Sequence, residues 1–184
     1  STGEKGNFWS DYPTLSADGR FVVFMSGSTN LVTGDSNGYV ADVFVHDRQT
    51  GVTSRISESS AGDQGNGSSD GPTLSADGHF VAFQSAASNL VTGDTNGHRD
   101  IFIQDRQTGV ISRVSVSSVG KQASGESWHP SISADGRFVA FVSQAVDLVT
   151  EDENGDFADV FIHDRQTGTT MLVSVSSTGE QGNC

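Results

Sequence analysis

Cysteine is nearly absent from this chain, because Cys184 is the only one and is also the last of the 184 residues. A disulfide within the chain is therefore impossible, and a structural zinc site would need several further ligands of this kind. The thiol could pair only with a second chain, and the simpler interpretation is an unpaired end residue.

Long apolar runs and basic side chains are also scarce. No stretch of 18 apolar residues occurs, so we expect no membrane-spanning helix. The chain has 10 lysines and arginines against 23 acidic residues, a formal net charge of −13. A surface this acidic repels phosphate backbones, so we expect no nucleic-acid partner. The absence of a signal peptide and the start at Ser1 favour a processed or excised chain, and hence a secreted or cell-surface location.

Proline is the third scarce residue, and its three copies mark a repeat. Pro13, Pro72 and Pro130 each open a Pro-x-(Leu/Ile)-Ser-Ala-Asp-Gly-(Arg/His)-Phe-Val segment at a nearly constant interval. Such a period indicates stacked or radial units that cannot each bury an apolar face alone. We predict one repeat domain over 1–184, with units at about 8–58, 67–117 and 125–176 and a terminal linker at 177–184.

Each unit predicts four short β-strands. In the first unit they are Pro13–Ser16, Phe21–Ser26, Asp42–Asp47 and Thr53–Ser57, rich in β-branched and aromatic residues. Glycine-containing turns join the first pair and the last pair. No segment sustains a helical period, so we expect no helix.

The complete repeat resembles the WD-like β-propeller repeats of TolB-type proteins. The segment above, extended by x-Phe, is followed each time by Asp-(Val/Ile)-Phe-(Val/Ile)-x-Asp-Arg-Gln-Thr-Gly, and the three copies span essentially the whole chain. The resemblance implies an all-β propeller of four-stranded antiparallel blades around a central channel, with the Pro-x-x-Ser strand innermost. It implies little about chemistry, because propellers host many functions.

Three blades per chain are too few to close a ring, since closed propellers have about four to eight. Unpaired sheet edges favour association with another chain, so we expect a homo-oligomer. A dimer with six blades, the count of TolB-type propellers, is favoured over a trimer with nine. Residues 177–183 nearly duplicate residues 1–7, which fits an excised set of repeats and also a protomer that overlaps the next one.

The long loop of each unit carries the strongest chemical signal, an Asp-x-Asn-Gly core with a later aspartate. Alternating oxygen ligands around a glycine turn are a way for short loops to bind Ca²⁺, although a plain Asx turn gives the same pattern. The predicted calcium ligands are Asp35, Asn37, Asp42, Asp94, Asn96, Asp100, Asp152, Asn154, Asp156 and Asp159.

The three loops are not equally suited to a cation. Glu151 and Glu153 add carboxylates to the third loop, which we expect to bind best because like charges repel until a cation neutralises them. The second loop contains His98 and Arg99, so we expect it to bind worst.

The copies differ just before the innermost strand, where the first and third units carry large side chains and the second carries glycine and serine. The simpler interpretation is that the aromatics plug the channel or seal the joint between chains. The alternative is a ligand site near one channel mouth, for which the predicted residues are Trp9, Asp11, Tyr12, Trp128 and His129.

Enzyme signals are weak, since the histidines show no ligand spacing and no nucleophile, P-loop or dinucleotide motif is present. We therefore expect a non-enzymatic binding or adhesion module with a glycan or protein ligand and calcium in its loops. A carbohydrate-binding lectin, a structural or engineered propeller fragment, and a polysaccharide lyase or glycosidase remain alternatives.

Overall fold

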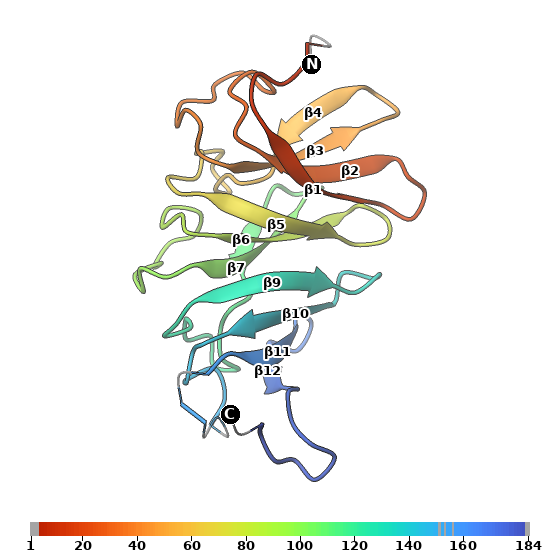
Figure 1. The fold of residues 1–184 in the computed structure, drawn as a ribbon. Helices are drawn as coiled ribbons and strands as arrows, with labels where there is room; N and C mark the ends of the chain where they lie inside the picture. The colour runs from red at the N-terminus through yellow and green to blue at the C-terminus, as the bar shows by residue number, and fades with distance from the viewer. Residues whose placement is uncertain (1–3, 151, 153, 156, 183–184) are drawn as a thin grey trace.

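The computed structural model describes residues 4–150, 152, 154–155 and 157–182, which form three four-stranded antiparallel sheets. Each sheet follows chain order, so neighbouring strands are joined directly (Figure 1). The first sheet contains β1 (Ser10–Leu15), β2 (Phe21–Ser26), β3 (Asp42–Asp47) and β4 (Val52–Arg55). The second contains β5 (Ser69–Leu74), β6 (Phe80–Ser85), β7 (Asp100–Asp105) and β8 (Ile111–Arg113). The third contains β9 (Ser127–Ile132), β10 (Phe138–Ser143), β11 (Asp159–Asp164) and β12 (Thr169–Leu172).

These sheets confirm the predicted all-β architecture, and we call them blades 1, 2 and 3. The two middle strands of blade 1 have the predicted bounds, and they pair with Phe24 opposite Phe44. The innermost strand begins earlier than predicted, at Ser10 instead of Pro13. It continues through a register shift between Asp11 and Thr14, where Tyr12 has a φ of 51°. A bulge of this kind lets a strand pass the proline, which cannot donate to the ladder.

The blades stack side by side along the chain, with β1, β5 and β9 adjacent (Figure 1). One apolar core lies between blades 1 and 2 and contains Val23, Val43, Val45, Ile56, Leu74, Val81, Phe83, Ala87, Leu90, Phe102 and Ile111. A second lies between blades 2 and 3 and contains Ala82, Ile101, Ile103, Val114, Ala123, Val139, Phe141, Ala145, Leu148 and Phe161. A central blade therefore needs a neighbour on each face to bury its side chains.

Polar contacts between blades repeat in the same way. The amide of Ala17 donates to the carbonyl of Ala76 at 2.8 Å. The amide of Ala76 in turn donates to the carbonyl of Ala134 at 2.9 Å. The guanidinium of Arg106 lies over the ring of Phe21, which belongs to the preceding blade, with its carbon 4.1 Å from the ring centre. Arg165 lies over Phe80 at the same distance. One interface is thus built twice within the chain.

The end blades leave half of that interface uncovered. Leu15 of blade 1 is 62% exposed, whereas Leu74 at the same position of blade 2 is 8% exposed. On the opposite side, Val173 of blade 3 is 44% exposed and Val114 of blade 2 is 1% exposed. The three blades form an open arc that does not close on itself, as the sequence predicted.

Candidate binding sites on the blades

The long loop of blade 1 brings its predicted ligands together. The side-chain amide nitrogen of Gln64 donates to Asp35 at 3.0 Å and to Asp42 at 2.9 Å. The amide nitrogen of Asn37 donates to the same Asp42 oxygen at 3.1 Å. Asp42 is fully buried, and Arg55 on β4 lies 3.9 Å from it. The two carboxylates are therefore bound by donors of the protein itself.

In blade 2 an arginine joins the two aspartates directly. Arg113 Nη1 lies 3.2 Å from Asp94 Oδ1 and 2.9 Å from Asp100 Oδ2. Burial raises the pKa of Asp94 above its ordinary value and the nearby Asp100 raises it further, while Arg113 opposes both effects. Asn96 donates to Asp100 at 2.9 Å. The guanidinium lies where a bound cation would neutralise this pair.

Blade 3 keeps the aspartates and loses the arginine. Phe161 of β11 pairs with Leu172, as Phe44 pairs with Arg55 and Phe102 with Arg113. Asp159 is buried and accepts a hydrogen bond from Ser174 at 2.5 Å.

Among the described residues, the glutamine that donates to the blade 3 aspartates is more distant from them than its counterpart in blade 1. Gln181 reaches Asp152 at 3.2 Å and Asp159 at 3.5 Å. Asp156, Glu151 and Glu153 lie outside the described residues.

Calcium binding by these loops stays a prediction. Among the described residues, no three His, Cys, Asp or Glu side chains converge as a metal site would require. The buried Oδ1 atoms of Asn37 and Asn154 have no hydrogen-bond partner in the described structure. The sequence analysis missed four contact residues of these loops, Arg55, Arg113, Gln64 and Gln181. An alignment of the three copies could have indicated them, because they stand at matching positions.

The predicted mouth residues come from two different blades. Asp11 and Tyr12 lie within β1, and Trp128 and His129 lie within β9, so these four are strand residues and not part of a preceding loop. Trp9 directly precedes β1 and is 42% exposed. Because β5 lies between β1 and β9, the chain does not join the five residues into one cluster (Figure 1).

Tyr12 and His129 have an uncommon backbone. Their φ angles are 51° and 55°, and Gly71 at the same position of blade 2 has 58°. Left-handed backbone disfavours most side chains other than glycine and is common at functional sites. The amide of His129 donates to Gln84 at 2.7 Å, and Gln84 donates to Asp70, which links the inner strands of blades 2 and 3.

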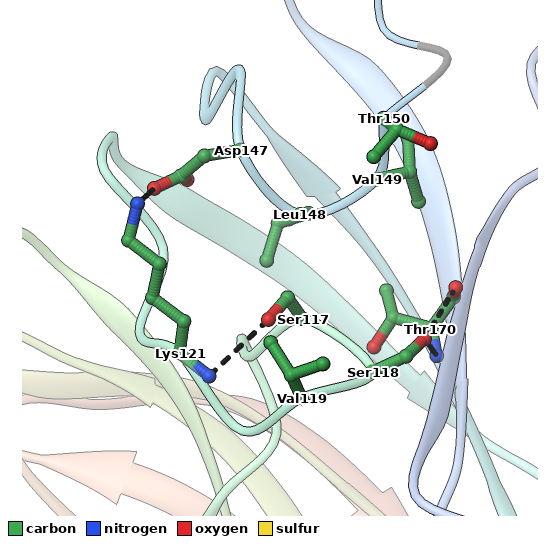
Figure 2. A pocket seen from close by; sticks show the side chains of 9 residues that line it. All are labelled: Ser117, Ser118, Val119, Lys121, Asp147, Leu148, Val149, Thr150 and Thr170. Atoms are coloured by element: carbon green, nitrogen blue, oxygen red, sulfur yellow. Dashed lines mark hydrogen bonds and ion pairs between the residues drawn. The ribbon is translucent and has the colours of Figure 1, made fainter.

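A pocket of about 540 Å³ lies between blade 3 and the segment that links it to blade 2 (Figure 2). Lys121 forms an ion pair with Asp147 at 2.7 Å on one side, and Ser118 and Thr170 exchange hydrogen bonds on the other. A similar pocket of about 420 Å³ lies between blade 2 and the segment that links it to blade 1. The repetition marks both as spaces left by blade packing.

No family model matches the chain, and no curated protein matches it. Solved structures do show the same fold. A protein assigned as TolB from Agrobacterium tumefaciens is 20% identical, with a TM-score of 0.53, over 94% of this chain and 50% of its own length.

Two peptidase structures also contain this fold. The β-propeller domain of the Trilobed protease from Pyrococcus furiosus, described as having an open velcro topology, is 15% identical with a TM-score of 0.57, over 91% of this chain and 42% of that one. Dipeptidyl peptidase 4 from Porphyromonas gingivalis is 19% identical with a TM-score of 0.52, over 91% and 26%.

These likenesses define the class of fold. The chain consists of three tandem blades of a TolB-like β-propeller. It spans about half the length of the TolB-type structure and less of the peptidases. The described part of the chain contains no helix of the length and apolar character needed to cross a membrane.

Proposed function

We propose that this chain is a non-enzymatic binding module, located outside the cell or on its surface, that supplies half of a β-propeller ring. A second copy completes six blades, in preference to three copies with nine. The observation that carries this proposal is the exposure of two faces, one on blade 1 and one on blade 3. Each corresponds to one side of the interface that joins blade 1 to blade 2 and blade 2 to blade 3. A large apolar area left in water favours association.

The molar mass in solution tests ring completion. Light scattering after size exclusion, with reductant present so that Cys184 forms no disulfide, should give twice the chain mass of 19.3 kDa. A Cys184→Ser variant should behave identically because the association does not depend on the thiol. A mass of one chain at every concentration would reject ring completion.

A glycan or a peptide at the channel mouth is the ligand we propose. Support comes from the exposed Tyr12, held in a left-handed conformation, and from a second exposed aromatic group of blade 1, in which the ring of Phe8 contacts those of Trp9 and Tyr39. Aromatic side chains supply rigid contact area for such ligands.

The ligand proposal is tested with glycan and peptide arrays. Binding that a Tyr12→Ala variant loses at unchanged stability supports the proposal, and glycan hits alone would favour a lectin. Arrays without hits favour a purely structural module, while turnover of a polysaccharide would indicate a lyase or glycosidase.

Calcium binding is a second candidate function, which we propose for blade 3 first. The replacement of arginine by Leu172 supports it, because Asp152 and Asp159 lack the guanidinium that neutralises the blade 2 pair. Millimolar Ca²⁺ should raise the melting temperature, since binding to the folded state alone stabilises it. A Leu172→Arg variant should lose this response, and an unchanged melting curve in wild type with Ca²⁺ or EDTA would reject the candidate.

A further inference from the structure

The N-terminal residues occupy the position of a linker that arrives from a preceding blade. The side-chain amide of Asn30 donates to the carbonyl of Lys5 at 2.8 Å, as Asn89 of blade 2 donates to that of Gln64. The amide of Asn7 donates to Asn30 at 2.9 Å, as that of Asn66 donates to Asn89.

Close packing places the two segments in the same register. A Cβ added to Gly6 would meet Leu31 at 3.5 Å, and one added to Gly65 would meet Leu90 at 3.5 Å. Lys5 on blade 1 therefore corresponds to Gln64 on blade 2.

This correspondence predicts which side chains Lys5 would contact in a completed ring. The side chain of Gln64 reaches back to the blade that precedes it and binds Asp35 and Asp42. If blade 3 of another copy precedes blade 1, the matching carboxylates are Asp152 and Asp159. Lys5 would then replace Gln181, whose contacts with these two aspartates are 3.2 and 3.5 Å long.

The charges of Lys5 and of the blade 3 aspartates are complementary. Blades 1 and 2 carry Arg55 and Arg113 beside their aspartates, and blade 3 carries Leu172 instead. Lys5 is the one lysine among the four linker positions, since 64, 122 and 181 are all glutamine. The cation missing from blade 3 is thus present at the opposite end of the same sequence.

We propose that the ring is joined head to tail and that Lys5 of each copy forms an ion pair with Asp152 and Asp159 of the next copy. This proposal rests on ring completion by a second copy, and at Asp152 and Asp159 it is the alternative to the bound calcium proposed above. The occupant is a second copy and not an unrelated partner, because the contacts continue the interface within the chain. Arg48, which binds the carbonyl of Gly19 as Arg106 binds that of Gly78, would stack on Phe138 of that copy.

The test compares dimer dissociation constants of the full chain by sedimentation equilibrium in reductant. Lys5→Gln should weaken the dimer several-fold, and Lys5→Glu by about tenfold or more because it places like charges together. Lys121→Gln is the matched control, since Lys121 forms its ion pair with Asp147 within one chain. Raising the salt concentration should reduce the difference between wild type and Lys5→Glu.

A second variant identifies the contacted carboxylates. Leu172→Arg supplies the guanidinium from within blade 3, so in that background Lys5→Gln should no longer change the dissociation constant. A wild-type dimer in which both Lys5 variants match Lys121→Gln would overturn the ion pair and leave ring completion standing. A wild type that stays a single chain would overturn ring completion and this inference together.

Discussion

Blade 2 and the two end blades have nearly the same sequence but different surroundings. Ile101 of blade 2 is fully buried, whereas Val160 at the same position of blade 3 is 38% exposed. Phe83 of blade 2 is also fully buried, and its counterpart Phe24 in blade 1 is only partly so. Burial in this fold is therefore set by the neighbouring sheet, and one blade alone does not determine it.

The largest expected effect compares the two phenylalanines. Phe83→Ala should reduce the free energy of unfolding by about 3–5 kcal/mol, because it leaves a cavity in a packed core. Phe24→Ala should reduce it by clearly less in the separated chain, since solvent already reaches that ring. Urea unfolding at low protein concentration measures both.

The comparison becomes sharper when protein concentration is varied. If a second copy covers blade 1, the cost of Phe24→Ala should rise with concentration while that of Phe83→Ala changes less. Equal costs for the two variants in the separated chain would contradict the difference in burial.

A smaller effect compares the turn glycines Gly136 and Gly19, which have φ angles of 73° and 69°. A Cβ on Gly136 would lie 2.3 Å from Phe80 of the preceding blade, whereas one on Gly19 meets only Arg48 at 3.6 Å. Left-handed alanine costs about 1–2 kcal/mol at either position. Gly136→Ala should cost about 1–3 kcal/mol more because it also overpacks an interface.

Thermal or urea unfolding of Gly19→Ala, Gly136→Ala and a control at Gly109 measures this difference. Gly109 has a φ of 73° and open space around a Cβ, so Gly109→Ala reports backbone strain alone. In the dimer Gly19→Ala should also weaken association, because Phe138 of the next copy would meet the new methyl group. A Gly136→Ala variant as stable as Gly109→Ala would contradict the close packing.

The fold could be predicted from the sequence because the strand signals are local and occur three times. The middle strands, such as Phe21–Ser26, have the same bounds in the structure. The start of β1 could not be predicted in the same way. Its extension to Ser10 depends on pairing with Ser26 beyond the bulge, and no local pattern around Tyr12 reports that pairing.

The candidate loop site was predicted only in part. Asp94 and Asp100 stand out in the sequence by their spacing within one loop. Arg113 does not, because it reaches them only through the register of β7 and β8, in which it pairs with Phe102. The distance along the chain between Arg113 and the two aspartates therefore does not reveal their contact, because strand pairing brings them together.

The smallest expected effect compares the ion pairs at the first hairpin of each blade. Arg137 Nη2 lies 2.6 Å from Asp164 in blade 3, and blade 2 has His79 at 2.8 Å from Asp105 instead. The hydrogen bond from Arg137 is the main reason that the pKa of Asp164 lies below its ordinary value. A lowered folded-state pKa contributes stability above the unfolded carboxyl pKa of about 4 and loses it as the pH falls through the folded value.

Arg137→Gln should therefore reduce stability slightly at neutral pH, because the arginine side chain is 40% exposed and ion pairs in contact with solvent contribute little. The difference from wild type should shrink as the pH falls below about 4, because Asp164 takes up a proton there in the unfolded chain and in the variant, while the folded wild type keeps this carboxylate ionised until a lower pH. Urea unfolding between pH 2 and 7 measures it. A difference that stays constant to the lowest pH would show that Arg137 acts by packing on the Phe138 ring, 4.7 Å from its guanidinium carbon, and not through its charge.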